Sequence, residues 1–306
     1  MACAPRIIRA MRTCVIFNPA ARGNKARHFR RHLGDMAGQS AFKATNAPGD
    51  ARRLAAEAVA ENFELIVAAG GDGTIHEVLN GLGDAPDGFE RARFGVLPLG
   101  TVNVFARELK IPLRIARAWD VLQNGREMNI DLGCAEYSAN GVRQKRFFAQ
   151  LAGAGLDARA IELMDWSHKK KIGPLAYVIA GLKALREQKP KITVHMDGKD
   201  FAGELVLIGN GKFYGGSFEI LPAADLRDGL LEVCLFPRVD FPTLLRCAPG
   251  FLARQKLPEK MVCRFRAEKF ALVCESAAAF ELDGEWVGNL PVTFSVERDR
   301  LRVIAP

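Results

Sequence analysis

Residues 69–78, AGGDGTIHEV, place three glycines and the carboxylate of Asp72 where a strand is expected to lead into a helix. The apolar residues 65–68 before them predict a buried strand, and the apolar residues after them recur at helical spacing. In an α/β sheet ligands bind at this edge, and a helix N-terminus there favours phosphate. Glycines also let backbone N–H groups approach an anion. We therefore predict a nucleotide phosphate site with Asp72 near a metal or a hydroxyl; the alternative is a glycine-rich turn without a ligand.

Three other predicted strands, residues 14–17, 42–45 and 94–97, also end in small or polar residues. These endings are residues 18–22, Thr45 and residues 98–101. Strands that alternate with helices predict a parallel α/β domain. Because the carboxyl ends of parallel strands share one edge, we expect the four endings to face one phosphate-binding crevice.

The second half of the chain has a different pattern, with short apolar runs separated by turn residues. Strands are expected at residues 128–132, 146–151, 192–196, 204–208, 230–236, 270–274, 280–282 and 292–296, with a helical insertion clearest at 174–186. Three Asp-Gly pairs lie among them, and such pairs are typical of hairpin turns: Asp197-Gly198, Asp228-Gly229 and Asp283-Gly284. The second half is therefore predicted to be mainly antiparallel β.

Composition limits the class of protein. The 306 residues carry a net charge of +8, which favours an anionic partner. Seven cysteines include no C-x-x-C pair and several lie in apolar runs, so we expect small core residues in a reducing cytosol. The longest apolar stretch, residues 172–182, is too short to span a bilayer, and no signal peptide is recognised. We expect a cytoplasmic protein that is not integral to a membrane.

Several common motifs are excluded. HEVLN begins like a zinc-protease helix, but Asn80 stands where the second histidine belongs. The glycine stretch lacks the third glycine of a dinucleotide fingerprint. Gly211-Lys212 is followed by Phe213 rather than Ser or Thr, and the protein-kinase signatures H-R-D and D-F-G are missing. A nucleotide site must therefore use another architecture.

Five segments occur in one order over most of the chain: FNPAARGNKAR, GGDGTIHEVLNGL, PLGTVNVFARELKIP, GNGKFYGGSFEILPAADLRDGLLEVCLF and ELDGEW. In them the sequence resembles the diacylglycerol kinase catalytic-domain family, which includes sphingosine and ceramide kinases and many bacterial lipid kinases. The resemblance implies an N-terminal nucleotide domain (12–126) like NAD kinases and 6-phosphofructokinases, with a parallel sheet. It implies a β-sandwich-like lipid-substrate domain at 127–297, and suggests that residues 298–306 return to the first domain as a strand.

The resemblance also implies site residues. The ATP site would be lined by Asn18, Pro19, Ala20, Ala21, Arg22, Thr45, Gly70, Gly71, Asp72, Gly73, Thr74, Ile75, His76 and Thr101. Asp72 would belong to the network that holds catalytic Mg²⁺ through water. Asp283, with Glu285 two residues on, would occupy the position of the base that deprotonates the lipid hydroxyl, and the choice between them stays open. A plain hairpin turn is the alternative for Asp283-Gly284.

A second, structural Mg²⁺ is implied at residues 225–230, with Asp225 and Asp228 as carboxylate ligands beside the Leu230 carbonyl. Two close carboxylates suit a hard cation, but they also suit a solvated loop. The sequence departs from many bacterial members at His76, where they have Asn, and this departure bears on the substrate class more than on activity.

These observations predict a lipid kinase that uses ATP and Mg²⁺ and phosphorylates a diacylglycerol-like or sphingoid-like hydroxyl at the inner membrane surface. Basic residues at 22–31 and 169–171 would attract anionic lipid, or they form solvated faces. Nucleic-acid binding is not expected, since no motif for it is present; a homodimer stays open. The alternatives are a soluble NAD-kinase-like enzyme for a small molecule and a catalytically silent regulator that binds lipid or nucleotide.

Overall fold

The computed structural model describes residues 11–20, 40–156, 158–159, 189–240, 242–243, 246, 258 and 261–306. The chain divides into two compact units. The first contains residues 1–132, 215–217 and 298–306, and the second contains residues 133–214 and 218–297. The helices predicted at residues 24–36 and 174–186 lie outside the described residues.

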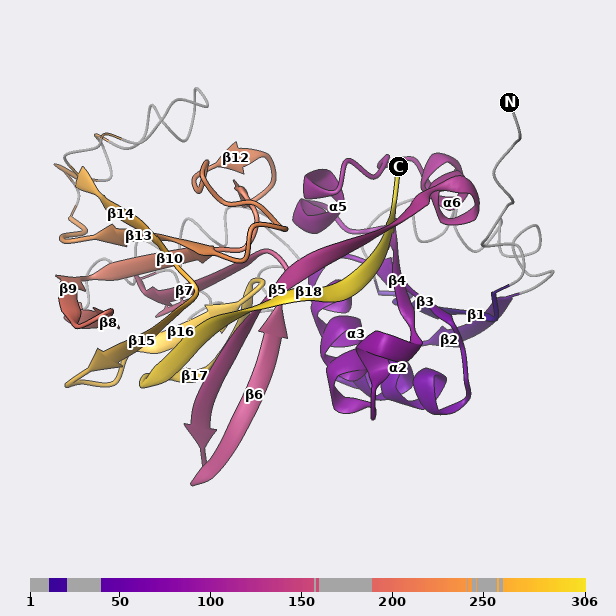
Figure 1. Ribbon diagram of the computed structural model, residues 1–306, viewed down its shortest axis with the longest axis horizontal. Helices are drawn as coiled ribbons and strands as arrows, with labels where there is room; N and C mark the ends of the chain where they lie inside the picture. Colours follow the sequence, from indigo (N-terminus) through magenta and orange to yellow (C-terminus); the bar gives the residue numbers. More distant parts are fainter. Residues whose placement is uncertain are drawn as a thin grey trace. The chain divides into compact units, whose positions relative to one another are not determined.

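The first unit is built on four parallel strands in the order β2-β1-β3-β4. They are β1 (Thr13–Phe17), β2 (Ser40–Ala44), β3 (Leu65–Gly70) and β4 (Arg93–Pro98). The helices are α2 (Asp50–Ala60), α3 (Asp72–Asp84), α4 (Gly88–Arg91), α5 (Val104–Glu108) and α6 (Ile115–Asn124). In Figure 1, α2 and α3 lie below these strands and α6 lies above them. Every residue of β3 is buried, as its continuous apolar run predicts for a covered parallel strand.

Helices α2 and α3 pack against each other at short range. The predicted apolar stripe of α2 is buried at Leu54, Ala55, Ala58 and Val59. The close approach requires a glycine at position 81 of α3, because a Cβ there would lie 2.1 Å from the Arg52 carbonyl oxygen. This pairing fixes α3, and therefore the glycine stretch at its start.

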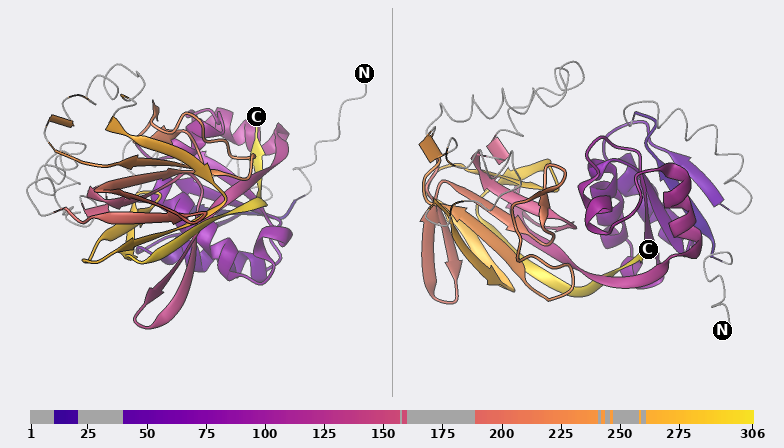
Figure 2. Two further views of the ribbon diagram at one scale, coloured as in Figure 1. Left: turned by 60° about the vertical axis from the view of Figure 1, so that its left-hand side comes forward. Right: turned by 90° about the horizontal axis from the view of Figure 1, so that it is seen from above.

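The second unit is mainly antiparallel β, and the predicted fold class is confirmed. A six-stranded sheet has the order β14-β13-β10-β7-β16-β17. Its strands are β7 (Leu151–Gly155), β10 (Leu205–Gly209), β13 (Leu231–Phe236), β14 (Cys263–Ala267), β16 (Ala279–Leu282) and β17 (Glu285–Asn289). Figure 1 labels β13, β10 and β7 next to one another, in agreement with their pairing, and Figure 2 shows the strands from two further sides.

Other strands complete this unit or continue into the first. They are β5 (Arg126–Ala139), β6 (Val142–Phe148), β8 (Ile192–Met196), β9 (Lys199–Gly203), β11 (Phe213–Tyr214), β12 (Phe218–Glu219), β15 (Lys269–Cys274) and β18 (Val292–Ala305). Strand β18 pairs with β15 in the second unit, and its Val303 pairs in parallel with Phe94 of β4 in the first. Residues 298–306 thus add a strand to the sheet of the first unit.

Two predictions at the level of single elements are wrong. Residues 146–151 do not form one strand, because β6 ends at Phe148 and β7 begins at Leu151. Residues 292–296 lie in a strand as predicted, and this strand, β18, runs on without a break to Ala305. Asp228-Gly229 does not join two paired strands, whereas Asp197-Gly198 and Asp283-Gly284 do, with positive φ at both residues of each pair.

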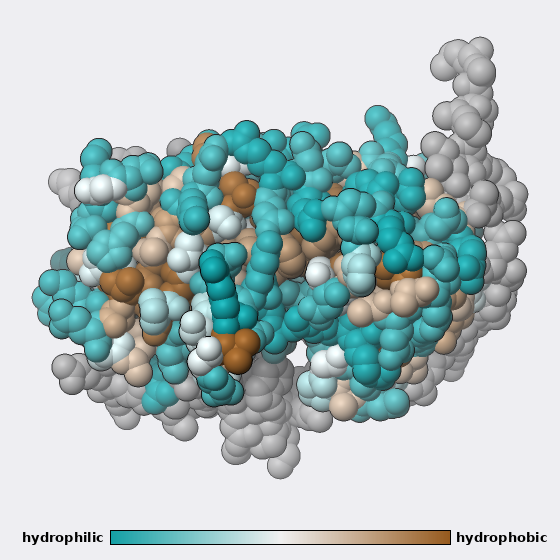
Figure 3. Space-filling view, turned by 60° about the horizontal axis from the view of Figure 1, so that its bottom comes forward, coloured by the Kyte–Doolittle hydropathy of each residue, from teal (hydrophilic) through white to brown (hydrophobic). Residues whose placement is uncertain are grey.

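The described cysteines are reduced, and Cys14, Cys134 and Cys234 are buried. Burial raises the pKa of Cys14 to about 11 and that of Cys134 to about 12, so both thiols stay protonated near neutral pH. None of the helices that the structure describes is long and apolar enough to cross a bilayer. The face in Figure 3 is largely hydrophilic, with separate apolar patches.

Aromatic packing holds the core of the second unit together. Phe294 stacks on Phe270 at 5.6 Å between ring centroids and meets Phe148 and Phe280 edge-on at 6.0 and 6.4 Å. All four side chains are buried.

We expect Phe294→Ala to lower the free energy of unfolding of this unit by about 3–5 kcal/mol, because it removes a buried ring and leaves a cavity. Val142→Ala is the control, since Val142 is 59% exposed, and it should change stability by less than about 0.5 kcal/mol. Urea titration measures both. Equal effects of the two substitutions would contradict the assignment of Phe294 to the core.

Candidate active site

The four predicted strand endings meet at one edge of the first unit's sheet. Phe17, the last residue of β1, pairs with Ala44 and with Ala69, and Gly70 pairs with Pro98. The residues that follow these strands are therefore neighbours along the carboxyl edge. This is the edge where a parallel sheet places its ligand-binding loops.

Asn18 connects the first of these endings to the glycine stretch. Its Nδ2 donates to Thr74 Oγ1 at 3.2 Å, and its backbone N–H donates to the Ala69 carbonyl. Its Oδ1 accepts the backbone N–H of Ala20, which closes a turn around Pro19. Ala21 and Arg22, also predicted for this site, lie outside the described residues.

The glycine stretch crosses the loop that follows β4, and the two segments contact each other through their backbones. The N–H groups of Leu99 and Gly100 both donate to the Gly70 carbonyl. A Cβ on Gly100 would lie 2.5 Å from the Cα of Gly71, so a side chain has no room there. A Cβ on Gly70 would lie 2.3 Å from Thr74 Oγ1. The glycines are needed for this crossing, whether or not a ligand is bound.

Helix α3 begins directly at this crossing. Gly71 is its N-cap in an extended conformation, and no side chain caps the helix. Its first backbone N–H groups thus point toward the strand ends, as at helix N-termini that bind anions. Asp72 lies in the first turn, and its Oδ1 accepts the Phe105 N–H of α5 at 3.4 Å. Gly73 follows in the same turn.

The next residues face the interior. Thr74, Ile75 and His76 are 6%, 2% and 4% exposed. The Nδ2 of Asn80 donates to the His76 carbonyl and lies 3.4 Å from His76 Nε2. Ile75 and His76 therefore support the start of α3 from inside the unit.

Thr45 and Thr101 lie in the loops that follow β2 and β4. Thr45 is buried, and its N–H donates to the Phe17 carbonyl, whereas Thr101 is exposed. Asn103 was missed by the sequence analysis. It is fully buried in a left-handed conformation, and its Nδ2 donates to the Gly100 carbonyl at 2.7 Å. An Asn shortly after a Gly-Thr turn is a signal that could have indicated this support.

Carboxylates fix the segment after β2. Glu77 of α3 accepts the N–H groups of Gly49 and Ala51 at 2.9 Å each, so it caps α2 in place of a local side chain. Asp50 accepts the N–H groups of Asn46 and Ala47. These two bonds, and then the Arg53 side chain, lower the pKa of Asp50 below its ordinary value of 3.8.

In the second unit, Asp283 anchors the break between β6 and β7. Its Oδ2 accepts the Ala149 N–H, and its Oδ1 accepts the N–H groups of Gln150 and Leu151, all within 3.0 Å. Its own N–H donates to the Leu151 carbonyl. Asp283 is thus a hairpin residue and a side-chain anchor at once, which a plain turn does not explain.

Glu285 begins β17 two residues later and is half-buried. Glu281, in the strand that leads into this turn, stabilises it. Its side chain is fully buried and accepts the Gly284 N–H at 2.6 Å. Sequence reasoning missed Glu281, although a charged residue in an apolar strand is a detectable signal.

Two buried amides, also missed, organise the surroundings of Asp283. Gln150 accepts the N–H groups of Asn210 and Gly211 on its carbonyl, and its Nε2 donates to the Phe213 carbonyl. Asn210 donates from Nδ2 to the Ala149 carbonyl at 2.8 Å. Segment 210–213 is therefore tied to the peptide groups that Asp283 binds.

In the predicted metal loop, an arginine side chain pairs with one of the predicted carboxylate ligands. Asp225 Oδ1 accepts the Arg227 N–H, and Asp228 Oδ1 accepts the Leu230 N–H, both at 3.0 Å. Asp228 Oδ2 forms an ion pair with Arg266. Within the described part of the chain, no group of three or more His, Cys, Asp or Glu side chains could hold a metal.

Comparison with known proteins identifies the family to which this arrangement belongs. Residues 12–135 match the model of the diacylglycerol kinase catalytic domain, and residues 150–305 match the YegS C-terminal NAD kinase beta sandwich-like domain. The diacylglycerol kinase of Bacillus subtilis (strain 168) is 31% identical, with 96% of each chain covered. That of Staphylococcus aureus (strain bovine RF122 / ET3-1) is 30% identical, with 96% of this chain and 92% of the relative covered. The chain belongs to the diacylglycerol kinase family.

The fold agrees with this membership. A crystal structure of a diacylglycerol kinase from Bacillus anthracis str. Sterne superposes with a TM-score of 0.74 at 23% identity, over 97% of both chains. As a member of this family, the protein is a kinase, and therefore a transferase.

For the nucleotide site that the sequence predicts here, we expect Gly100→Ala to weaken ATP binding by more than about tenfold, because the added Cβ cannot fit against Gly71 and must separate the two loops. Gly288→Ala in β17 is the control, since its Cβ would make ordinary contacts with the Phe280 ring at 3.5 Å and the Tyr137 ring at 3.9 Å. Isothermal titration calorimetry compares the two. Equal ATP affinity in both variants would show that ATP binding does not need the close crossing of Gly71 and Gly100.

Asp50 gives a pH-dependent prediction. Its pKa is lowered in the folded state, so its stabilising effect is complete above the unfolded value near 3.8 and is lost as pH falls through the folded pKa. Asp50→Asn should therefore lower the Tm at neutral pH, and the difference from wild type should shrink below about pH 4. Thermal unfolding by circular dichroism tests this. A difference that is constant with pH would contradict the ionic role.

Proposed function

We propose that the protein is a lipid kinase that transfers the γ-phosphoryl group of ATP to a lipid hydroxyl at the inner, cytoplasmic face of a membrane. Family membership supports a lipid kinase. The observation that carries the proposal is that one chain combines a glycine-loop crossing at strand ends with an Asp-Gly-Glu turn anchored on backbone N–H groups. The lipid is of diacylglycerol-like or sphingoid-like chemistry.

The first unit would bind the nucleotide. The backbone N–H groups at the start of α3 and the loops beside Asn18, Thr45 and Thr101 suit the phosphates, because they offer donors without a Cβ in the way. The Asp72 carboxylate in that first turn suits a Mg²⁺ held through water. When bound, ATP with Mg²⁺ supplies the phosphoryl group and neutralises its charge. Phosphoryl transfer depends mainly on positioning and charge stabilisation, which these backbone groups provide.

The second unit would activate the acceptor. A carboxylate has about four acceptor positions, and Asp283 uses three of them on backbone N–H groups. We therefore assign Glu285, at the start of β17, as the base that takes the proton from the lipid hydroxyl. Asp283 positions it by holding the turn.

The basic charge supports action at a membrane. The net charge of +8 and the sequence pI near 9.2 favour an anionic surface, where each basic residue near the lipid contributes about 1 kcal/mol. The substrate is embedded in such a surface, so the kinase must come to it.

We expect Glu285→Gln to lower lipid phosphorylation by about 10²–10⁴-fold, because the amide cannot accept the proton, while ATP affinity and Tm stay at the wild-type values. Asp283→Asn should lower the Tm as well. The NH₂ group of the amide replaces one carboxylate oxygen and cannot accept a hydrogen bond from a backbone N–H group. Transfer of labelled phosphate from ATP to mixed vesicles, with NAD as a competing acceptor, measures the activity. Labelling of NAD without lipid, or full activity of Glu285→Gln, would overturn the proposal.

A further inference from the structure

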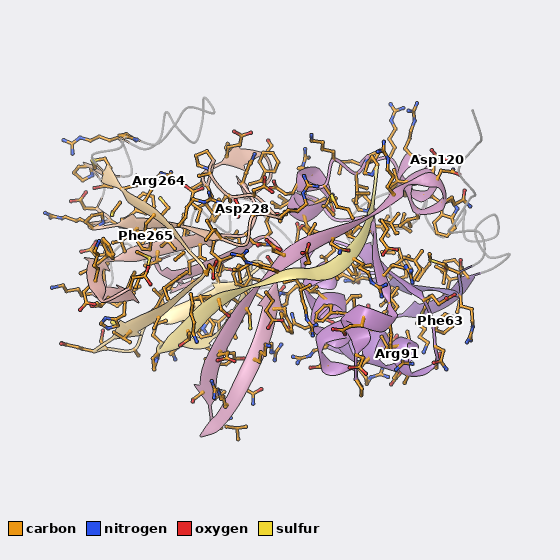
Figure 4. The ribbon with its side chains drawn as sticks, viewed as in Figure 1. Phe63, Arg91, Asp120, Asp228, Arg264 and Phe265 are labelled. Carbon is orange, nitrogen blue, oxygen red and sulfur yellow. The ribbon has the colours of Figure 1, made fainter. Side chains whose placement is uncertain are left out.

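Two arginines of β14 reach the loop that precedes β13. Strands β13 and β14 are antiparallel, with Glu232 opposite Arg266 and Cys234 opposite Arg264. Because side chains alternate along a strand, Arg264 and Arg266 share one face, whereas Phe265 faces the other and stacks on Phe201 at 4.8 Å. Figure 4 labels Arg264 and Phe265 on β14 and Asp228 in the loop.

Arg264 fixes the first part of the loop. Its Nη1 binds Glu232 Oε1 at 2.7 Å, and its Nη2 donates to the Ile220 carbonyl at 2.8 Å. Glu232 is 1% exposed, and its second oxygen accepts the Ala223 N–H at 2.7 Å. A buried ion pair of this kind is tolerated when further hydrogen bonds satisfy the charges, as they do here.

Arg266 fixes the second part. It pairs with Asp228 Oδ2, while Asp228 Oδ1 accepts the Leu230 N–H. The donor set of Asp225, Asp228 and the Leu230 carbonyl has the chemistry that Mg²⁺ prefers. However, both oxygens of Asp228 are engaged, and one of them already binds a cation.

The local charge also opposes a metal ion. The carboxylates of Asp228 and Glu232 are matched by the guanidinium groups of Arg266 and Arg264, which leaves Asp225 as the remaining loop carboxylate. A divalent cation at Asp228 would be repelled at short range by the Arg266 guanidinium, which already pairs with Asp228 Oδ2. The predicted structural Mg²⁺ therefore does not fit the residues present.

We infer that Arg264 and Arg266 hold segment 220–230 in place of a structural divalent cation. We call this pair the arginine clamp. Arginine suits this task, because its planar guanidinium binds a carboxylate and a carbonyl at once and stays charged at all relevant pH values. The loop then needs no metal to keep its conformation.

The clamp has a path to the turn that carries Asp283, within the second unit. Arg264 holds the Ile220 carbonyl, and the next residue, Leu221, donates its N–H to the Lys212 carbonyl at 3.2 Å. Phe213, after Lys212, accepts Gln150 Nε2, and the Gln150 N–H binds Asp283 Oδ1. Arg264 of the clamp is therefore linked, through hydrogen bonds and two peptide links, to the Asp283 turn, which lies on the acceptor side under the proposed function.

The test measures Tm with and without millimolar Mg²⁺ in the full chain, without nucleotide. Wild type should show no shift with Mg²⁺. Arg266→Met should lower the Tm by about 2–4 °C and should regain it on addition of Mg²⁺, because Asp228 and Asp225 then become open to a cation. The double variant Arg266→Met with Asp228→Asn should lose this response.

Two further variants separate the clamp from a general loss of charge. Arg266→Lys keeps the cation and should stay insensitive to Mg²⁺. Arg143→Met removes an ion pair with Glu136 in the same unit, where the arginine side chain is 79% exposed, and it should change neither Tm nor the Mg²⁺ response.

The inference is overturned if Mg²⁺ raises the Tm of wild type and Asp228→Asn removes that rise, since the loop would then be a metal site. It is also overturned if Arg266→Met keeps the wild-type Tm or ignores Mg²⁺. Because the measurement needs no turnover, its outcome is independent of the proposed lipid kinase activity.

Discussion

The backbone contact between Gly71 and Gly100 is the constraint on which the first unit's site depends. Strands β3 and β4 are parallel neighbours, so their loops leave the sheet at adjacent points and must cross without side chains. Once they cross, the Gly70 carbonyl accepts two N–H groups of the other loop, and α3 can start only in one direction. The orientation of Asp72 and of the first N–H groups of α3 follows from that start. The proposed phosphate site is thus a property of backbone packing first and of side chains second.

The second unit solves a different backbone problem with a side chain. The break between β6 and β7 frees three consecutive N–H groups, and unpaired buried N–H groups are costly. Asp283 accepts all three, which fixes its turn against β7. Glu281 in β16, the strand that leads into this turn, accepts a further N–H group of the turn. Glu285 follows on a rigid strand. In the proposed function, the two acidic residues of the D-G-E triplet thus take separate tasks, Asp283 a positional one and Glu285 a chemical one.

The sequence predicts the first unit's sheet well, because its strands are short apolar runs with glycine or polar endings, and the endings of all four fall on one edge. The second unit is predicted in kind but not in detail. The break at residues 149–150 is invisible in the pattern, since its cause is a carboxylate 134 residues away. Likewise Asn103, Gln150 and Asn210 are ordinary polar residues in sequence, and only tertiary hydrogen bonds show what they hold.

The three Asp-Gly pairs show where local pattern stops being informative. Asp197-Gly198 closes an ordinary hairpin, Asp283-Gly284 closes a hairpin whose aspartate also binds three backbone N–H groups, and Asp228-Gly229 closes no hairpin and pairs with Arg266. The dipeptide fixes a tendency to turn, through the left-handed conformation that Asp and Gly tolerate. What the aspartate then does depends on the charge or the donors that distant strands bring to it. An arginine on β14 and a strand break before β7 give the same dipeptide a cationic partner in one place and a set of amide donors in the other.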